Sequence, residues 1–172
     1  MVFLSFSPGP NNILCSINGT RYGWAKTIPL ISGMIAGFFL VGFFTSLSVE
    51  VIKENENILE SMKYVCCSYL LYLSYMIIVD DPKKYKEDVE ALESPMQFKT
   101  GFVMQFINGK VIFYYIILMT VYASRLGEDY SIKFGLLVGA TLVGVGAVST
   151  WTTLGVFLRQ FLSNEDKARR TN

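Results

Sequence analysis

Histidine is absent from this chain of 172 residues, and its three cysteines lack the spacing of a metal or redox motif. Histidine is the commonest metal ligand and the usual proton carrier near neutral pH. Zinc and thiol-redox motifs place two residues between paired cysteines, whereas Cys66 and Cys67 are adjacent and Cys15 is remote. We therefore expect no metal and no cofactor. The cysteines are interpreted as small packing residues, which disfavours a membrane thiol oxidoreductase.

Charge is scarce as well. Charged residues make up 17% of the chain and the formal net charge is +1, whereas about 25% is usual in soluble domains. A nearly neutral chain has no electrostatic attraction for nucleic acid, so we expect no nucleic-acid partner.

Long stretches contain no charged residue at all. They cover residues 1–20, 27–49, 64–79 and 134–158, and residues 100–124 contain a single lysine. A helix needs about 20 residues to cross the hydrocarbon core, which the shortest stretch reaches by extending back over residues 58–62. The sequence therefore predicts an all-α membrane protein with five transmembrane helices in a lipid bilayer. A soluble helical protein is disfavoured because its helices would keep a polar face.

Lysine and arginine are divided unequally between the two sides of this predicted membrane. Ten lie in residues 21–26, 80–99 and 159–170, and four lie on the other side. The positive-inside rule places the richer side in the cytoplasm. We expect an external N-terminus, a cytoplasmic C-terminus and one domain over residues 1–172. Residues 80–99 are then a cytoplasmic loop, either a solvated linker or a segment that binds a partner.

A helix break followed by a G-x-x-x-G helix occurs twice. The first break, around Gly9, precedes Gly33 and Gly37, and the second, at Gly109, precedes Gly135 and Gly139. The two units are three predicted spans apart, so they have opposite orientations. Interrupted segments at matching places in two halves are typical of transporters with inverted repeats. The alternative is that G-x-x-x-G recurs by chance as a helix-packing face.

The repeat also predicts a span that the sequence does not contain. A counterpart of residues 64–79 is expected near position 171, at the end of the chain. The helix before Pro8 is short too, because the seven residues before it cover only about 10 Å. We expect an inverted-repeat (3+3) transporter fold that is truncated at both ends, with its sixth helix missing.

Lys110 lies within the apolar stretch of residues 100–124. A charge inside a membrane is costly and by default marks a function. Pro8 and Pro10 interrupt the first span, and Pro10 lies eleven residues before Arg21, so this break is about 16 Å from the membrane edge. Lys110 is expected at a similar depth. The two breaks are therefore predicted to face each other.

Both helices that restart at these breaks are predicted to attract an anion, because helix N-termini carry free N–H groups and a partial positive charge. Lys110 adds a full charge, and nearby amide side chains add donors and acceptors. No acidic residue lies in the spans, so a substrate ammonium would use the backbone carbonyls near Phe6, Ser7 and Ile107. The candidate substrate-binding residues are Pro8, Gly9, Pro10, Asn11, Asn12, Gln105, Asn108 and Lys110.

Each part of this site has a structural alternative. The prolines are also compatible with a plain kink. Gln105 and Asn108 are compatible with hydrogen-bonded contacts between helices. Lys110 is compatible with a side chain that reaches the interface or occupies a cluster of carbonyls. The tyrosines of the spans are interpreted as packing or lipid-facing residues.

These motifs resemble a known family, the LysE/RhtB-type amino-acid exporters, over residues 5–165. The opening, Ser7-Pro8-Gly9-Pro10-Asn11-Asn12-Ile13-Leu14, is similar to the start of that family, and Tyr69-Leu70-Leu71-Tyr72-Leu73 to its third helix. Gln105-Phe106-Ile107-Asn108-Gly109-Lys110 is similar to its fourth-helix motif, in which proline usually stands where this chain has Gly109. This departure is similar to the cysteine/O-acetylserine exporter branch.

The resemblance implies a proton-driven secondary exporter of an amino acid or derivative in the bacterial inner membrane, and not an enzyme. It places the family motifs on seven of the candidate residues named above, all except Asn12. The substrate would be a small neutral amino acid such as cysteine or O-acetylserine, and the oligomeric state is left open. The alternative function is a truncated membrane remnant that folds or associates without transporting.

Overall fold

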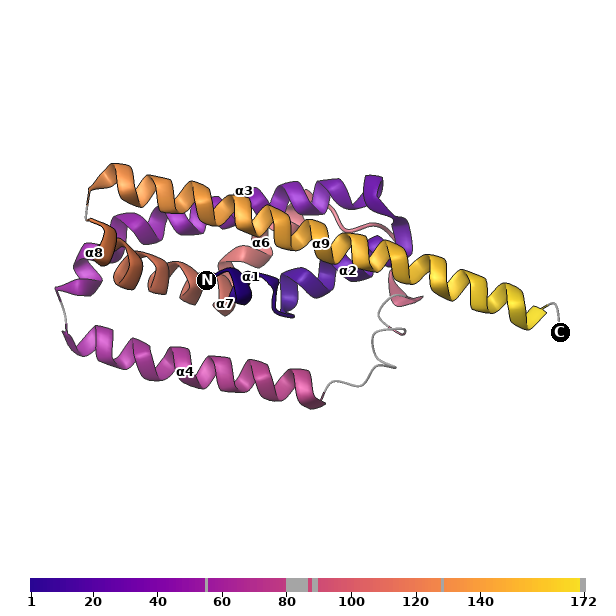
Figure 1. Cartoon of the computed structure of the whole chain (residues 1–172), viewed down its shortest axis with the longest axis horizontal. Coiled ribbons are helices and arrows are strands. Elements are labelled where there is room, and N and C mark those ends of the chain that lie inside the picture. The colour runs from indigo at the N-terminus through magenta and orange to yellow at the C-terminus, as the bar shows by residue number, and fades with distance from the viewer. Residues whose placement is uncertain (55, 80–86, 88–89, 128, 171–172) are drawn as a thin grey trace.

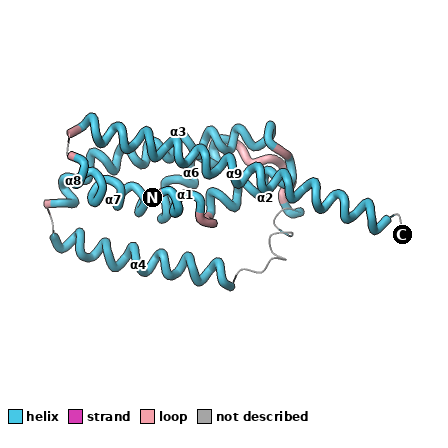
Figure 2. Tube along the Cα trace, viewed as in Figure 1, coloured by secondary structure: helices cyan, strands magenta, loops and turns pink. Residues whose placement is uncertain are grey.

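The structure is a computed structural model that describes residues 1–54, 56–79, 87, 90–127 and 129–170. These residues are helical and contain no strand, which confirms the predicted all-α class (Figures 1 and 2). The elements are α1 (Val2–Phe6), α2 (Pro10–Tyr22), α3 (Trp24–Lys53), α4 (Glu56–Val79), α6 (Phe98–Ile107), α7 (Gly109–Ile117), the π-helical η1 (Leu118–Tyr122), α8 (Ala123–Leu126) and α9 (Tyr130–Arg170).

Two helices within this part of the chain are long and apolar enough to cross a membrane. They contain the candidate spans Trp24–Ser48 and Tyr130–Gln160. A third span results if Phe98–Ile107 and Gly109–Tyr122 are taken together, since they form one run bent by 61°. The count of five spans stays a prediction. The predicted loop at residues 80–99 falls partly on residues 80–86 and 88–89, outside the described part.

The two predicted helix breaks are present, and local sequence explains both. The first separates α1 from α2 at Ser7–Gly9, and Pro10 occupies the first turn of α2, where its missing N–H has no consequence. The second separates α6 from α7 at Asn108, whose side chain accepts a hydrogen bond from the Lys110 backbone N–H at 3.1 Å. This is the usual role of asparagine at a helix N-cap.

The helices around these breaks pack closely because glycines face neighbouring backbones. On α3, a Cβ at Gly33 would collide with the Phe98 carbonyl of α6, and one at Gly37 would lie 2.7 Å from the Gln105 Cγ. On α9, a Cβ at Gly155 would collide with the Ser16 carbonyl of α2. Thus α3 packs on α6 while α2 packs on α9. Figure 1 shows α9 crossing the bundle near α2 and α3.

The second G-x-x-x-G does not repeat the contacts of the first. A Cβ at Gly135 or Gly139 would meet no atom within 4 Å. The pair therefore matches Gly33 and Gly37 in spacing but not in packing.

Helix α4 lies along one side of the bundle (Figure 1). It meets the bundle at the second break, where the Tyr69 ring centroid lies 5.3 Å from that of Phe113. A Cβ at Gly109 would lie 3.0 Å from the Tyr69 Cε2. Glycine at this position therefore leaves room for the α4 tyrosine against the start of α7.

Candidate functional site

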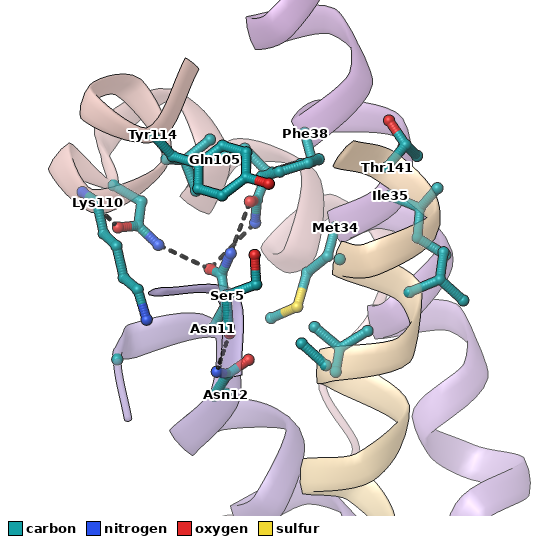
Figure 3. Close-up of a pocket in the computed structure, with 17 residues that line it drawn as sticks. Ser5, Asn11, Asn12, Met34, Ile35, Phe38, Gln105, Lys110, Tyr114 and Thr141 are labelled. Carbon is teal, nitrogen blue, oxygen red and sulfur yellow. Dashed lines mark hydrogen bonds between the residues drawn. The ribbon is translucent and has the colours of Figure 1, made fainter. Parts of the chain in front are cut away.

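Three amide side chains join the two helix breaks. Asn11 donates to the Gln105 Oε1 at 2.7 Å, and its Oδ1 accepts from the Gln105 Nε2 at 3.2 Å and from the Asn108 Nδ2 at 3.0 Å. The Gln105 Nε2 also donates to the Gly101 carbonyl at 2.9 Å. We call Asn11, Gln105 and Asn108 the amide cluster (Figure 3). Gln105 is fully buried and Asn108 is 4% exposed, so the cluster is a buried polar network whose donors and acceptors satisfy one another.

The Lys110 side chain also crosses from the second break to the first. Its Nζ donates to the Ser7 carbonyl at 2.8 Å and contacts the Ser7 Oγ at 3.0 Å. Gly9 permits this path, because a Cβ there would lie 3.0 Å from the Nζ and 3.1 Å from the Cδ of the lysine. The predicted meeting of the two breaks is therefore present, with Lys110 at the junction.

The carbonyls at the end of α1 are already occupied. The Trp151 Nε1 of α9 donates to the Phe6 carbonyl at 2.9 Å. The Asn12 Nδ2 donates to the carbonyls of Ser5 at 2.8 Å and Ser7 at 2.9 Å. Groups of the chain itself thus bond to the Phe6 and Ser7 carbonyls in this structure, and the use of these carbonyls and that of Ile107 by a substrate ammonium stays a prediction.

A cavity lies beside this junction, between the amide cluster and the apolar faces of α3, α7 and α9. Its volume is about 60 Å³. Six of the eight predicted site residues line it, namely Gly9, Asn11, Asn12, Gln105, Asn108 and Lys110, whereas Pro8 and Pro10 do not. The prolines shape the break and the other residues face the cavity. Their role in binding stays a prediction.

The cavity has one polar and one apolar wall. Its other lining residues are Ser5, Met34, Ile35, Phe38, Val111, Tyr114, Thr141, Gly144, Val145, Ala147 and Val148. Lys110 is the charged group among all the lining residues, which include no carboxylate and no histidine. Such a site favours an anionic group at one end and apolar surface at the other. Within the described part of the chain, no three His, Cys, Asp or Glu residues gather as a metal-ligand group.

Sequence reasoning missed the apolar wall and the contribution of Trp151. Met34 and Phe38 stand one turn apart on α3, and Thr141 and Val145 do so on α9. In an almost wholly apolar span, such residues carry no signal that separates a cavity-facing side from a lipid-facing side. The structural alternative for Gln105 and Asn108 is present as well, since both bond to Asn11 across the helices.

Comparison with known proteins places the chain in a family. The family model of the LysE type translocators matches residues 2–172. The cysteine/O-acetylserine efflux protein of Salmonella choleraesuis (strain SC-B67) is 27% identical over 159 residues, which are 91% of this chain and 80% of that protein. The protein of the same name in Escherichia coli (strain K12) is 26% identical with the same coverage. No solved structure matches at a significant level. With a translocator model that covers almost every residue of this apolar helical chain, the protein belongs to the LysE type translocator family.

Proposed function

We propose that the protein is a secondary-active exporter, and not an enzyme, that moves a small neutral amino acid or derivative across the bacterial inner membrane. The observation that carries this proposal is the position of Lys110. This lysine lines the cavity, and its Nζ bonds to Ser7 where the two helix breaks meet. Family membership supports translocation, and the names of the relatives support cysteine or O-acetylserine as the kind of solute.

The substrate carboxylate binds Lys110 in place of the Ser7 oxygens. An ammonium exchanges a neutral carbonyl for a carboxylate readily, because a hydrogen bond between two charged groups is the stronger one. The first turns of α2 and α7 add free N–H groups and a partial positive charge. The substrate ammonium uses hydroxyl oxygens of the cavity, those of Ser5 and Thr141 (Figure 3), since Trp151 and Asn12 still bond to the Phe6 and Ser7 carbonyls.

Transport follows from the relative movement of two inverted repeats around this cavity. The cross-packing supports the repeat: the first broken span packs through α2 on α9, and the second packs through α6 on α3. Each broken span thus packs on the long helix of the other repeat, the first through the helix after its break and the second through the helix before its break. The excess of basic residues supports an external N-terminus and a cytoplasmic C-terminus.

The test is efflux of radiolabelled cysteine, O-acetylserine and serine from preloaded vesicles. Lys110→Met removes the ammonium but keeps the length of the side chain, and Lys110→Arg keeps the charge. A charged hydrogen bond contributes about 1.5–3 kcal/mol, so Lys110→Met is expected to lower efflux about 10- to 150-fold, with partial recovery in Lys110→Arg. The exposed Lys99→Met is the matched control. Equal efflux from wild type and Lys110→Met contradicts the proposed role.

A second candidate is a membrane protein that folds but does not transport. It is favoured because the polar groups where the two helix breaks meet, the amide cluster and Lys110, already have hydrogen-bond partners within the chain. In that case wild-type vesicles retain every substrate, and Lys110→Met changes only the thermal stability of the protein. Substrate-specific efflux by wild type eliminates this candidate.

A further inference from the structure

The wall opposite Lys110 contains a narrow point formed by one aromatic ring and one glycine. Phe38 of α3 and Gly144 of α9 both line the cavity. A Cβ built on Gly144 would lie 3.5 Å from the Phe38 Cε1, an ordinary van der Waals contact, so the ring and the α9 backbone are separated by the space of a single Cβ. The Phe38 ring also packs against two tyrosines of α7, with its centroid 4.6 Å from that of Tyr115 and 5.8 Å from that of Tyr114.

We propose that Phe38 and Gly144 form a size filter that limits the width of the substrate side chain. The proposal rests on the proposed function and names the residues that select the solute. The cavity of about 60 Å³ exceeds the roughly 10–15 Å³ that one water needs, but it is small, so the side chain of a bound solute meets its walls. With the carboxylate at Lys110, a branched side chain such as that of leucine meets the Phe38 ring.

Two variants change this narrow point in opposite directions. Phe38→Ala removes the ring and widens the narrow point, whereas Gly144→Val adds a branched side chain toward the ring and narrows it further. A difference of one methylene in an apolar pocket changes discrimination by about 10- to 200-fold. The leucine-to-alanine selectivity ratio is therefore expected to rise at least about tenfold in Phe38→Ala. The cysteine-to-alanine ratio is expected to fall in Gly144→Val.

The experiment measures binding of radiolabelled alanine, cysteine and leucine to purified full-length protein, together with efflux of the same solutes from vesicles. Phe44→Ala is the matched control, because Phe44 lies on the same helix with 56% of its surface exposed. Unchanged ratios in both variants, with alanine still bound, overturn the filter and leave the exporter proposal intact. If wild type binds none of the three solutes, the filter and the exporter proposal fall together.

A different set of contacts points to the gate on the other side of the cavity. The segment Leu92–Met96, just before α6, is bound to the end of α2 by side chains. The fully buried Asn18 accepts from the Met96 backbone N–H at 2.8 Å and donates to the Thr27 Oγ1 at 3.0 Å. The Tyr22 hydroxyl donates to the Leu92 carbonyl at 2.6 Å.

This segment packs against a cluster that forms part of the cavity wall. Met96 packs against an apolar cluster of Cys15, Leu30, Ile31, Met34 and Val148, and two of these residues, Met34 and Val148, also line the cavity. The cluster and the segment thus separate the cavity from the side that carries the excess of basic residues.

We infer that the segment Leu92–Met96 is the inner gate, closed in this structure and held by Asn18 and Tyr22. A solute that leaves the cell has to enter the cavity past this segment. Because Cys15 is fully buried in the cluster beneath it, the rate at which Cys15 reacts reports how often the gate opens. This readout is independent of transport.

The test is the rate of Cys15 alkylation by N-ethylmaleimide in membranes, in a background with Cys66→Ser and Cys67→Ser. Loss of a single hydrogen bond shifts an equilibrium about 2- to 10-fold, so Asn18→Ala and the milder Tyr22→Phe are each expected to accelerate labelling by that factor. The exposed Asn57→Ala and Tyr75→Phe are the matched controls. Unchanged labelling in both gate variants overturns the inference. Acceleration in Tyr22→Phe without a change in thermal stability supports it.

Discussion

The Nζ of Lys110 lies 2.8 Å from the carbonyl oxygen of Ser7, although the two residues are 103 positions apart in the sequence. Each belongs to a helix break, so one side chain joins the two interruptions of the bundle. The Ser7 Oγ lies 3.0 Å from the same nitrogen. The ammonium is thus held by neutral oxygens, which we expect the carboxylate of a bound substrate to displace.

Asn11→Ala is expected to lower the stability of the protein more than the same substitution at an exposed asparagine does. The change leaves Gln105 and Asn108 without one partner each, and a buried polar group without a partner costs about 1–3 kcal/mol. Thermal unfolding in detergent measures the effect, with the exposed Asn57→Ala as control. Equal midpoints for the two variants would show that the amide cluster does not stabilise the junction.

Two glycines of α9 are expected to respond oppositely to alanine. Gly155→Ala drives a Cβ into the Ser16 carbonyl of α2, and forced overpacking costs about 1–3 kcal/mol. Gly139→Ala meets no atom within 4 Å and gains about 0.5–1 kcal/mol because alanine favours a helix more than glycine does. The measurement is the unfolding midpoint of both variants. The same shift in both would argue against close packing of α2 on α9.

Trp151→Phe removes the N–H that holds the end of α1. The indole donates to the Phe6 carbonyl at 2.9 Å, so its loss is expected to lower stability by about 1 kcal/mol and to reduce efflux, because α1 carries Ser7. Trp24→Phe, at a position that is 38% exposed, is expected to change neither. A variant of Trp151 with normal efflux and stability would mean that α1 holds its position without this bond.

Gly9→Ala tests the path of the lysine rather than the stability of the fold. The added Cβ approaches the Lys110 Nζ and Cδ to 3.0 and 3.1 Å, which displaces the flexible end of the side chain. Substrate efflux is expected to fall severalfold, while stability changes by less than about 1 kcal/mol. At Gly146 an alanine Cβ has an ordinary 3.7 Å contact with the Phe6 Cζ, so Gly146→Ala serves as control. Unaltered efflux in Gly9→Ala would contradict the tight path.

The helix breaks were predictable because their causes are local. Pro10 at the start of α2 and Asn108 at the N-cap of α7 act through their own backbones. Counting residues along each span was then enough to place Pro10 and Lys110 at a similar depth. The same reasoning found the family, because its motifs coincide with the residues that form the breaks.

The partners of these residues were not predictable in the same way. Trp151 bonds to Phe6 from 145 positions away, and nothing in an apolar span marks which tryptophan faces the bundle. The sequence predicts that Lys133 lies in a loop outside the membrane. In the structure its side chain is 4% exposed, and its Nζ lies 5.5 Å from the ring centroid of Tyr130. Its burial depends on how α9 packs against the other helices, and the hydropathy of the sequence does not predict that packing.

If the two repeats move as proposed, the amide cluster marks the point about which we expect them to rotate. Asn11 on one repeat bonds to Gln105 and Asn108 on the other, midway along the broken spans. A small rotation about the amide cluster would move the two ends of the bundle in opposite directions, so that one end of the cavity closes as the other opens. The hydrogen bonds of the amide cluster would then stay intact while access to the cavity changes from one side to the other.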